Sequence, residues 1–454
     1  AFTVGAVAST GGTVVANYLN STNSGVSVTV PVANDATLVN GTIQLRMKVG
    51  GNAYADIGSA ATITTADTTQ AVTLTDEQIE DAANYAEGGV LTFTAIITDA
   101  SGNATTGTAS GTTLTVDQDV PVISETTAIT TPDNDTTPTV VMTSDQAGAI
   151  SCPSGQTLTG DVTAEAAANS VTFAALADGT YGAVTLLVTD AAGNASNTLT
   201  LTSFTIDNGA PSAFTVGAVA STGGTVVANY WNSTNTGVNV TVPVANDASL
   251  TGGTIQLRAK IDSEAYANLG NAYTIQGSDL GSSVTISNTA TTLEALSDEV
   301  ANTEVITVTA IITDTSSNAT TGTASSTTLT VDQSAPTVTF VSSSISDGSY
   351  KSGVLVPILI ATNEAITVDT TSGTPSILLE TGASDDAVAY TSGSLSDVLI
   401  FNYTVGAGDT SSDLDYASTS ALVLNSGTMT DAAGNALVLT LPTVGALNSL
   451  GANK

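Results

Sequence analysis

The sequence predicts an all-β protein of four β-sandwich domains in tandem, forming an elongated array. Many short segments alternate apolar and polar residues with a period of two, which is typical of antiparallel strands with one buried face. Clusters of Gly, Asn, Asp and Ser, which favour turns, separate these segments. An acidic turn of the form Asp-x-x-x-Asn recurs at residues 99–103, 190–194, 314–318 and 431–435, at intervals that suit single domains.

A long internal duplication establishes the order of the domains. Residues 1–12 recur without change as residues 213–224, and residues 30–36 recur as 242–248. Both copies end in Val-Asp-Gln, so the first and third domains are of the same type. A proline follows each Val-Asp or Ile-Asp strand end and opens the next domain. The expected domain boundaries are 1–118, 119–208, 209–333 and 334–454.

The individual strands follow from the alternation. In the first domain it marks strands at 26–30, 42–45 and 91–95. Residues 76–85 suit a helical turn, with Thr75 as its cap and Gln78 completing a capping box. Apolar runs predict further strands at 139–142, 170–173 and 183–188 in the second domain, and at 355–360, 398–405 and 421–424 in the fourth.

The composition excludes several classes of function. The chain has 41 Asp and Glu against six Lys and Arg, which gives a formal net charge of −35. Such a charge disfavours nucleic acid and anionic membranes as partners, but attracts divalent cations. With no His and with Cys152 as the single cysteine, zinc sites and activated thiol nucleophiles are not expected, and neither is an enzyme. No stretch is apolar and long enough to predict a transmembrane segment.

The length of the domains and their many short strands suit a sandwich of immunoglobulin type. Over essentially its whole length the chain resembles the bacterial immunoglobulin-like repeats of large surface adhesins. The resemblance rests on the Asp-x-x-Gly-Asn turns and the Val-Asp-Gln-x-x-Pro joints, and on segments 347–350, 363–365, 414–419 and 450–454. It implies an extracellular location and a role in an adhesin, a surface layer or a filament.

The immunoglobulin topology predicts where the acidic residues meet. The B–C and F–G loops share one end of the sandwich, and strand A starts there, so the linker from the preceding domain arrives beside both loops. Each joint then gathers side-chain oxygens from linker, B–C loop and F–G loop. The predicted groups are Asp117, Asp119, Asp145, Asp190 and Asn194 at the first joint; Asp207, Asn246, Asp247, Asp314 and Asn318 at the second; and Asp332, Glu364, Asp431 and Asn435 at the third. The first domain offers Asp35, Asp99 and Asn103 at the corresponding end.

Carboxylates that converge in this way repel one another unless a cation lies between them. Calcium accepts six to eight oxygen ligands in loose geometry, so we expect it at these joints, where it would stiffen the contact between domains. The alternative is that Asp-x-x-Gly-Asn is only a tight turn, in which Asp and Asn bind their own backbone and Gly supplies a positive φ. At the second joint Ser317 replaces this Gly, which predicts weaker binding or a different fold of that loop.

Two other functions remain open at this stage. The fourth domain, the most divergent, is an alternative binding module for a glycan or a protein receptor. The whole chain is alternatively the spacer of a larger secreted enzyme. If the chain polymerises, self-association would bring a linker to Asp35, Asp99 and Asn103. The substitution of Trp231 for Leu19 between the duplicated domains indicates either an exposed contact residue or a packing change.

Overall fold

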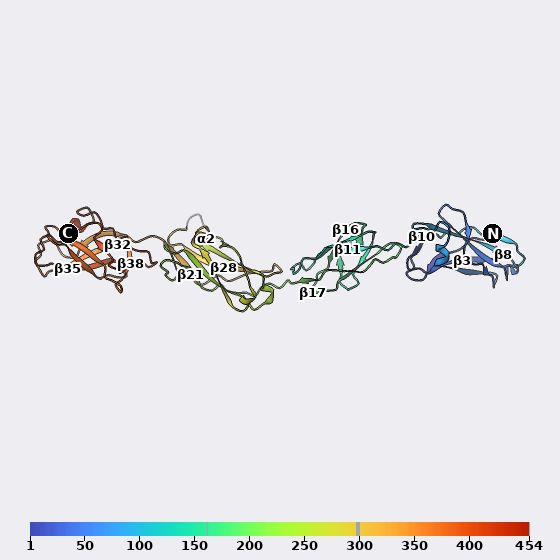
Figure 1. Cartoon of the computed structure of the whole chain (residues 1–454), viewed down its shortest axis with the longest axis horizontal. Helices are drawn as coiled ribbons and strands as arrows, with labels where there is room; N and C mark the ends of the chain where they lie inside the picture. The colour runs from blue at the N-terminus through green and yellow to red at the C-terminus, as the bar shows by residue number, and fades with distance from the viewer. Residues whose placement is uncertain (161, 297–299, 454) are drawn as a thin grey trace. The chain divides into compact units, whose positions relative to one another are not determined.

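The computed structural model describes residues 1–160, 162–296 and 300–453 (Figure 1). The protein is all-β, with immunoglobulin-like β-sandwiches. Its contacts divide it into two compact units, Ala1–Gly209 and Ala210–Lys454. Within them the buried hydrophobic residues form four separate cores, two in each unit. Each core lies inside one of the four predicted ranges, which are called domains 1 to 4 below.

Domain 1 has the strand order of an immunoglobulin-type sandwich. One sheet has the order β1-β3-β7, and the other has the order β2-β10-β8-β4-β5. The chain leaves the first sheet after β1 and joins the second as β2, which pairs in parallel with the last strand, β10. These elements correspond to strands A, B and E facing A′, G, F and C. Their bounds are β1 Val7–Thr10, β2 Tyr18–Asn20, β3 Gly25–Val32, β4 Thr42–Val49, β5 Ala55–Asp56, β6 Ala61–Thr62, β7 Thr68–Thr75, β8 Val90–Thr98, β9 Ala104–Thr106 and β10 Leu114–Asp117.

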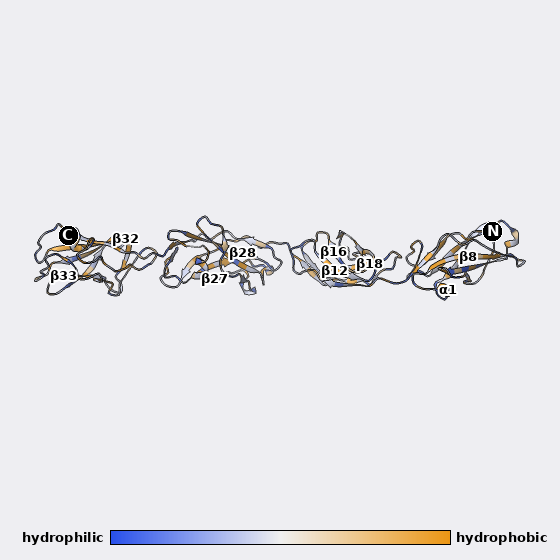
Figure 2. Ribbon diagram, turned by 90° about the horizontal axis from the view of Figure 1, so that it is seen from above, coloured by the Kyte–Doolittle hydropathy of each residue, from blue (hydrophilic) through white to orange (hydrophobic). Residues whose placement is uncertain are grey.

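The predicted alternation is confirmed in these strands. Val26, Val28 and Val30 of β3 are buried, whereas Ser27 and Thr29 between them are not fully buried. Figure 2 shows hydrophobic residues along strands such as β8, β28 and β32. The predicted helical turn forms as α1, Asp76–Glu80, and both halves of its capping box are present, although it ends earlier than expected. The 3₁₀ turn η1, Ala36–Leu38, follows β3.

Domain 3 repeats this arrangement, as the duplication requires. Its sheets have the orders β21-β23-β27 and β22-β30-β28-β24-β25. The bounds are β21 Val219–Thr222, β22 Tyr230–Asn232, β23 Gly237–Pro243, η2 Ala248–Leu250, β24 Thr254–Ile261, β25 Ala267–Asn268, β26 Tyr273–Thr274, η3 Gly277–Asp279, β27 Ser283–Thr289, α2 Ala290–Glu294, β28 Val305–Thr313, β29 Ala319–Thr321 and β30 Leu329–Asp332.

Trp231 is a core residue, which decides between its two predicted roles. Its side chain is fully buried, like that of Leu19 at the same position of domain 1. Two other positions of the same core change in the opposite direction. The cross-strand pair Met47 and Phe93 of domain 1 is replaced in domain 3 by the smaller pair formed by Ala259 and Val308. The large indole therefore takes up part of the volume that the two smaller residues release in the same core, as close packing favours.

Trp231→Leu is accordingly expected to destabilise domain 3 by about 3 kcal/mol, because the small neighbours cannot fill the space that the indole leaves. Adding Ala259→Met and Val308→Phe is expected to recover most of this loss, since it recreates the residues of domain 1 at these three core positions. Chemical denaturation of the full chain, followed by near-ultraviolet circular dichroism, measures both effects. Equal stability of the single and triple variants would contradict this account of the core.

Domains 2 and 4 are variations of the same sandwich. Domain 2 has sheets in the orders β11-β12-β16-β14 and β15-β13-β18-β19, with a separate β17-β20 pair. Its bounds are β11 Ile123–Thr127, β12 Thr139–Ser144, β13 Gly148–Ser151, β14 Leu158–Thr159, β15 Thr163–Ala164, β16 Ala168–Phe173, β17 Gly179–Tyr181, β18 Thr185–Thr189, β19 Leu199–Thr200 and β20 Phe204–Ile206.

In domain 4 the order is β31-β32-β35-β34-β33-β36, with β37 on β33 and β38 on β32. Its bounds are β31 Val338–Ser343, β32 Leu355–Asp369, β33 Ser376–Glu380, β34 Asp386–Ser392, β35 Ser396–Thr404, β36 Asp415–Tyr416, β37 Leu422–Val423, β38 Thr428–Thr430 and α3 Leu450–Asn453.

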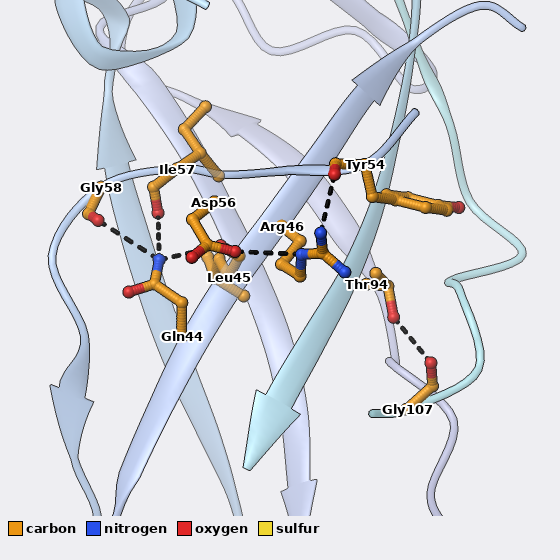
Figure 3. A network of polar contacts seen from close by, with 9 residues as sticks. All are labelled: Gln44, Leu45, Arg46, Tyr54, Asp56, Ile57, Gly58, Thr94 and Gly107. Carbon is orange, nitrogen blue, oxygen red and sulfur yellow. Dashed lines mark hydrogen bonds and ion pairs between the residues drawn. The ribbon is translucent and has the colours of Figure 1, made fainter. Parts of the chain in front are cut away.

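Most of the basic residues of the protein lie in one strand of domain 1 and the matching strand of domain 3. In domain 1, Arg46 binds the carboxylate of Asp56 at 3.0 Å and donates to the carbonyl oxygen of Tyr54 at 2.7 Å (Figure 3). Arg258 makes the second of these contacts in domain 3, to Tyr266. Lys48 and Lys260 lie over the rings of Tyr54 and Tyr266. Four of the six Lys and Arg are thus used on two matching strands, β4 and β24.

A membrane-crossing helix is not found in the described part of the chain, because none of its helices combines the necessary length and apolar character.

Candidate interdomain joints

The acidic turn has one structure in all four domains. In domain 1, Oδ1 of Asp99 accepts the backbone N–H of Asn103 at 2.8 Å, and Oδ2 accepts its side-chain amide at 2.8 Å. The same two bonds occur in the turns that begin at Asp190, Asp314 and Asp431. The expectation that Ser317 would change the fold of its loop was wrong: Ser317 adopts φ of 71°, close to the φ of Gly102, and the turn closes normally. The turn is therefore self-sufficient, as the alternative interpretation held.

The B–C and F–G loops lie together, as the topology predicted. The backbone N–H of Ala100 donates to the carbonyl oxygen of Thr37 at 3.2 Å in domain 1. In domain 3, Thr315 and Ser249 make the matching bond at 3.3 Å. Asp35 and Asp247 cap the turns η1 and η2 through Thr37 and Ser249. The hydrogen bonds from Thr37 hold the pKa of Asp35 below its usual value, and those from Asn103 do the same for Asp99.

At the first joint, the turn of domain 2 binds domain 1 directly. The side-chain oxygen of Asn194 accepts the N–H of Ser21 at 2.9 Å and its hydroxyl at 2.7 Å. The amide nitrogen of Asn194 donates to the carbonyl oxygen of Asp117, the last residue of β10, at 2.9 Å. In the reverse direction, the amide of Asn20 donates to the carbonyl oxygen of Ala192 at 2.7 Å. Asn20 and Asn194 are both fully buried, so each amide depends on these partners.

The third joint repeats this set of contacts. Asn435 of domain 4 accepts the N–H of Ser233 at 3.2 Å and its hydroxyl at 2.8 Å, and donates to the carbonyl oxygen of Asp332 at 2.9 Å. The amide of Asn232 donates to the carbonyl oxygen of Ala433 at 2.6 Å. The docked turns at residues 190–194 and 431–435 have the same sequence, Asp-Ala-Ala-Gly-Asn, and the two joints use the same hydrogen bonds. We call this arrangement, formed by Asn20, Ser21 and residues 190–194 or by Asn232, Ser233 and residues 431–435, the interlock.

Sequence reasoning missed the domain 1 and domain 3 halves of the interlock. They lie in an Asn-Ser-Thr-Asn turn at residues 20–23, which recurs unchanged at 232–235. The side chain of Asn20 accepts the N–H of Thr22 at 3.1 Å, and that of Asn23 accepts the N–H of Asn20 at 2.8 Å, so the turn is held before a partner arrives. The signal was available: the motif is present in domains 1 and 3 and absent from domains 2 and 4.

The glycine of the docked turns is required by close contact as well as by its backbone angle. At Gly193, φ is 92°, and a Cβ would lie 2.8 Å from Cγ2 of Val15 in domain 1. At Gly434 a Cβ would lie 2.8 Å from Cγ2 of Thr225 in domain 3. Gly102 has nearly the same φ of 91°, but no atom lies within 4 Å of its Cβ position.

We therefore expect Gly193→Ala and Gly102→Ala to share the backbone strain, about 1 to 2 kcal/mol for an L-residue with positive φ. Only Gly193→Ala should weaken the contact between domains 1 and 2, because only its methyl group meets a neighbouring domain. Hydrogen exchange at the Ser21 amide, which donates to Asn194, measures the contact. Equal exchange at Ser21 in the two variants would show that the close approach of Gly193 is unimportant.

The third joint also gathers three carboxylates. One oxygen from each of Asp332, Glu364 and Asp431 lies within 4.8 Å of the others. Asp431 is 3% exposed and is held by its own turn, Asp332 ends β30, and Glu364 lies where β32 is irregular. Burial, and then the charge of Asp431, raises the pKa of both Asp332 and Glu364. Among the described residues, this is the one group of three or more acidic side chains that converge so closely.

The first joint differs at one of these three positions. Asp145, predicted to face the joint, instead accepts the N–H of Val122 at 2.7 Å, just as Asn363 accepts that of Thr337 in domain 4. The next residue, Gln146, therefore occupies the position of Glu364; the carbonyl oxygens of both residues accept the preceding Ser or Thr hydroxyl at 2.6 Å. Burial, followed by the charges of Asp190, Glu87 and Asp119, raises the pKa of Asp117. Glu87, which accepts the N–H of Gln118 at 2.9 Å, was not among the predicted residues.

The residues predicted for the second joint belong to both units. Asp207 lies near the end of the first unit and accepts the N–H of Gly209 at 3.0 Å. Asn246, Asp247, Asp314 and Asn318 belong to the second unit. Their convergence stays a prediction.

The raised pKa values give the third joint a pH dependence in the absence of divalent cations. Asp332 and Glu364 have a raised pKa when domains 3 and 4 are in contact, so they bind more protons in that state than when the domains are apart. The contact is therefore most stable near and below the ordinary carboxyl pKa, and it weakens as pH rises through the raised pKa values. With chelator present, exchange protection at the Ser233 amide, corrected for the intrinsic effect of pH, should fall as pH rises above the ordinary carboxyl pKa of about 4. Protection that is independent of pH would contradict this expectation.

Comparison with known proteins adds similarities of fold only. No protein-family model matches the chain, and no curated protein matches it. Among solved structures, the FN1-FN3 domains of chicken CNTN1 are 10% identical, with 73% of this chain and 98% of that chain covered and a TM-score of 0.28. The Bacteroides ovatus protein SGBP-B, solved with a mixed-linkage heptasaccharide, is 12% identical over 89% of this chain and 91% of its own, with a TM-score of 0.14. The alpha-2-macroglobulin of E. coli is 9% identical over 87% of this chain and 28% of its own, with a TM-score of 0.17. All three TM-scores are low, so the fold assignment rests on the strand order described above.

Proposed function

We propose that this chain is an extracellular structural array, of the kind found in surface adhesins, surface layers or filaments. In this array, domains 1 and 2, and likewise domains 3 and 4, act as rigid pairs. The observation that carries the proposal is the interlock, which occurs with the same hydrogen bonds at two joints. A protein that only needed flexible spacing would not require buried amides at its joints, because exposed linkers cost less to form.

Calcium completes the third joint in this proposal. Asp332, Glu364 and Asp431 supply only oxygen donors, as a hard cation requires, and backbone carbonyls or water can fill the remaining positions. Few basic side chains are available to balance these carboxylates, because four of the six Lys and Arg lie in β4 and β24. A bound divalent cation would relieve the repulsion that raises the pKa of Asp332 and Glu364. The ion would then join the end of β30 in domain 3 to β32 and the acidic turn of domain 4.

Small-angle scattering of the full chain, with calcium and with EGTA, tests this function. The proposal predicts a narrow range of conformers in calcium and a wider range in EGTA, while far-ultraviolet circular dichroism stays the same. Magnesium should substitute poorly, because it demands stricter octahedral geometry. Identical scattering in calcium and EGTA would refute the role of the ion, and flexible joints in both would refute the rigid pairs as well.

A second candidate function, a binding module in domain 4, is supported by a different observation. This domain contains a large open cavity that is separate from the joint. The array and the binding module are compatible, because the two features lie at opposite ends of the domain.

A further inference from the structure

The cavity of domain 4 lies at the end of the sandwich that is farther from the joint. Strand β31 begins at Val338, which pairs with Thr362 close to Glu364, and runs away from the joint to Ser343. The cavity, of about 580 Å³, begins at Ser343. Two loops form its walls, residues 345–350 after β31 and residues 409–414 after β35, and Leu450 of α3 also lines it.

The cavity combines a few buried apolar side chains and several serine side chains with a fixed aromatic ring. Val356, Tyr403 and Leu450 contribute buried side chains. Tyr350 is 40% exposed, and its hydroxyl donates to the carbonyl oxygen of Ser346, which holds the ring in place beside the opening. A cavity of this size and mixed character suits a small organic molecule.

The charged groups that line the cavity are all negative. Asp347, Asp409 and Asp413 line it, and no Lys or Arg is among its lining residues. Asp409 is held by the hydroxyl of Tyr403 and by the N–H of Gly406 at 2.5 Å, whereas Asp347 and Asp413 are exposed. These three carboxylates do not converge as those of the third joint do, so they do not form a compact site for a metal ion.

We propose that this cavity binds a small organic ligand that carries a primary ammonium group. Carboxylates that lie apart from one another suit an ammonium group on a carbon skeleton better than a metal ion. Each carboxylate can accept a hydrogen bond from one N–H of the ammonium group. The face of Tyr350 adds cation–π attraction, and the apolar lining contacts the carbon skeleton. The same charges repel phosphate, sulfate and carboxylate ligands. This inference depends neither on calcium nor on the interlock.

Two sources share this chemistry, an aliphatic amine and an amino sugar, and isothermal titration of the full chain distinguishes them. The probes are 1,5-diaminopentane and glucosamine, with 1,5-pentanediol and glucose as neutral counterparts, all in EGTA at low ionic strength. Binding of either amine, without binding of its neutral counterpart, supports the proposal and identifies the source. Equal binding of an amine and its neutral counterpart, or binding of no amine, overturns it.

A double variant tests the residues. Asp347→Asn with Asp413→Asn removes two exposed charges and keeps the side-chain shapes, and it should weaken amine binding about tenfold or more. Asp397→Asn, in the same domain but outside the cavity lining, is the matched control and should leave binding unchanged. Undiminished binding by the double variant, with its circular dichroism unaltered, would overturn the proposed site.

Discussion

Asn194→Ala is expected to separate domain 2 from domain 1, with a loss of about 3 kcal/mol of interdomain coupling. The variant removes the acceptor of the Ser21 N–H and hydroxyl and the donor to the Asp117 carbonyl oxygen. A buried hydrogen-bonding group that loses its partner costs roughly 1 to 3 kcal/mol, and Ser21 loses one partner for two of its groups. The Ser21 amide should therefore exchange much faster in the variant, while the core strands of domain 1 keep their protection.

Asn103→Ala is the matched control for this experiment. Asn103 makes the same bonds with Asp99 that Asn194 makes with Asp190, but it is exposed, and these bonds lie within its own turn. Both variants lose the bonds inside the turn, so the difference between them isolates the contact between domains. If the Ser21 amide exchanged equally fast in both variants, the interlock would not hold the domains together.

Replacing the carboxylate of Glu364 by an amide should lower the calcium affinity of the third joint, and replacing the amide of Gln146 by a carboxylate should raise that of the first joint. Glu364→Gln leaves Asp332 and Asp431 as the only carboxylates of the third joint and should weaken its calcium affinity by about one to two orders of magnitude. Gln146→Glu adds a carboxylate at the first joint, at the position that corresponds to Glu364, and should strengthen calcium binding there. Calorimetric titration of each variant measures both changes.

The conservative change at Glu364 also separates charge from shape. Glu364→Gln keeps the length of the side chain, and the interlock formed by Asn435 does not involve it. The variant should therefore remain folded and should dock at least as well as the original protein in EGTA, because one repelling charge is gone. Unchanged calcium affinity in Glu364→Gln would mean that the three carboxylates do not form the metal site.

Much of the fold was predictable because its signals are local. The period of two in β3 follows from the burial of Val26, Val28 and Val30 on one face, and the capping box of α1 involves residues only three apart. The position of the acidic turns beside the B–C loops was also predictable, since the strand order of an immunoglobulin-type sandwich determines it. Domain-by-domain reasoning was sufficient for these features.

The contacts across the joints were harder to predict, since they join residues about 170 to 200 positions apart in the sequence. Asn20 and Asn194 each look like ordinary turn residues, and only the folded chain brings them together. The choice between Asp145 and Gln146 depends on which of them accepts the N–H of Val122, and only the folded chain shows that Asp145 does. The volume exchange around Trp231 involves strands distant in sequence, so substitution at one position could not reveal it.

The most direct test of the rigid joint is the distance between one spin label on domain 3 and one on domain 4, in a Cys152→Ser background that removes the only cysteine of the chain. Pulsed electron resonance would record the distribution of distances in calcium and in EGTA at neutral pH. The account predicts one narrow distribution in calcium and a clearly broader one in EGTA. The same broad distribution in both conditions would contradict it.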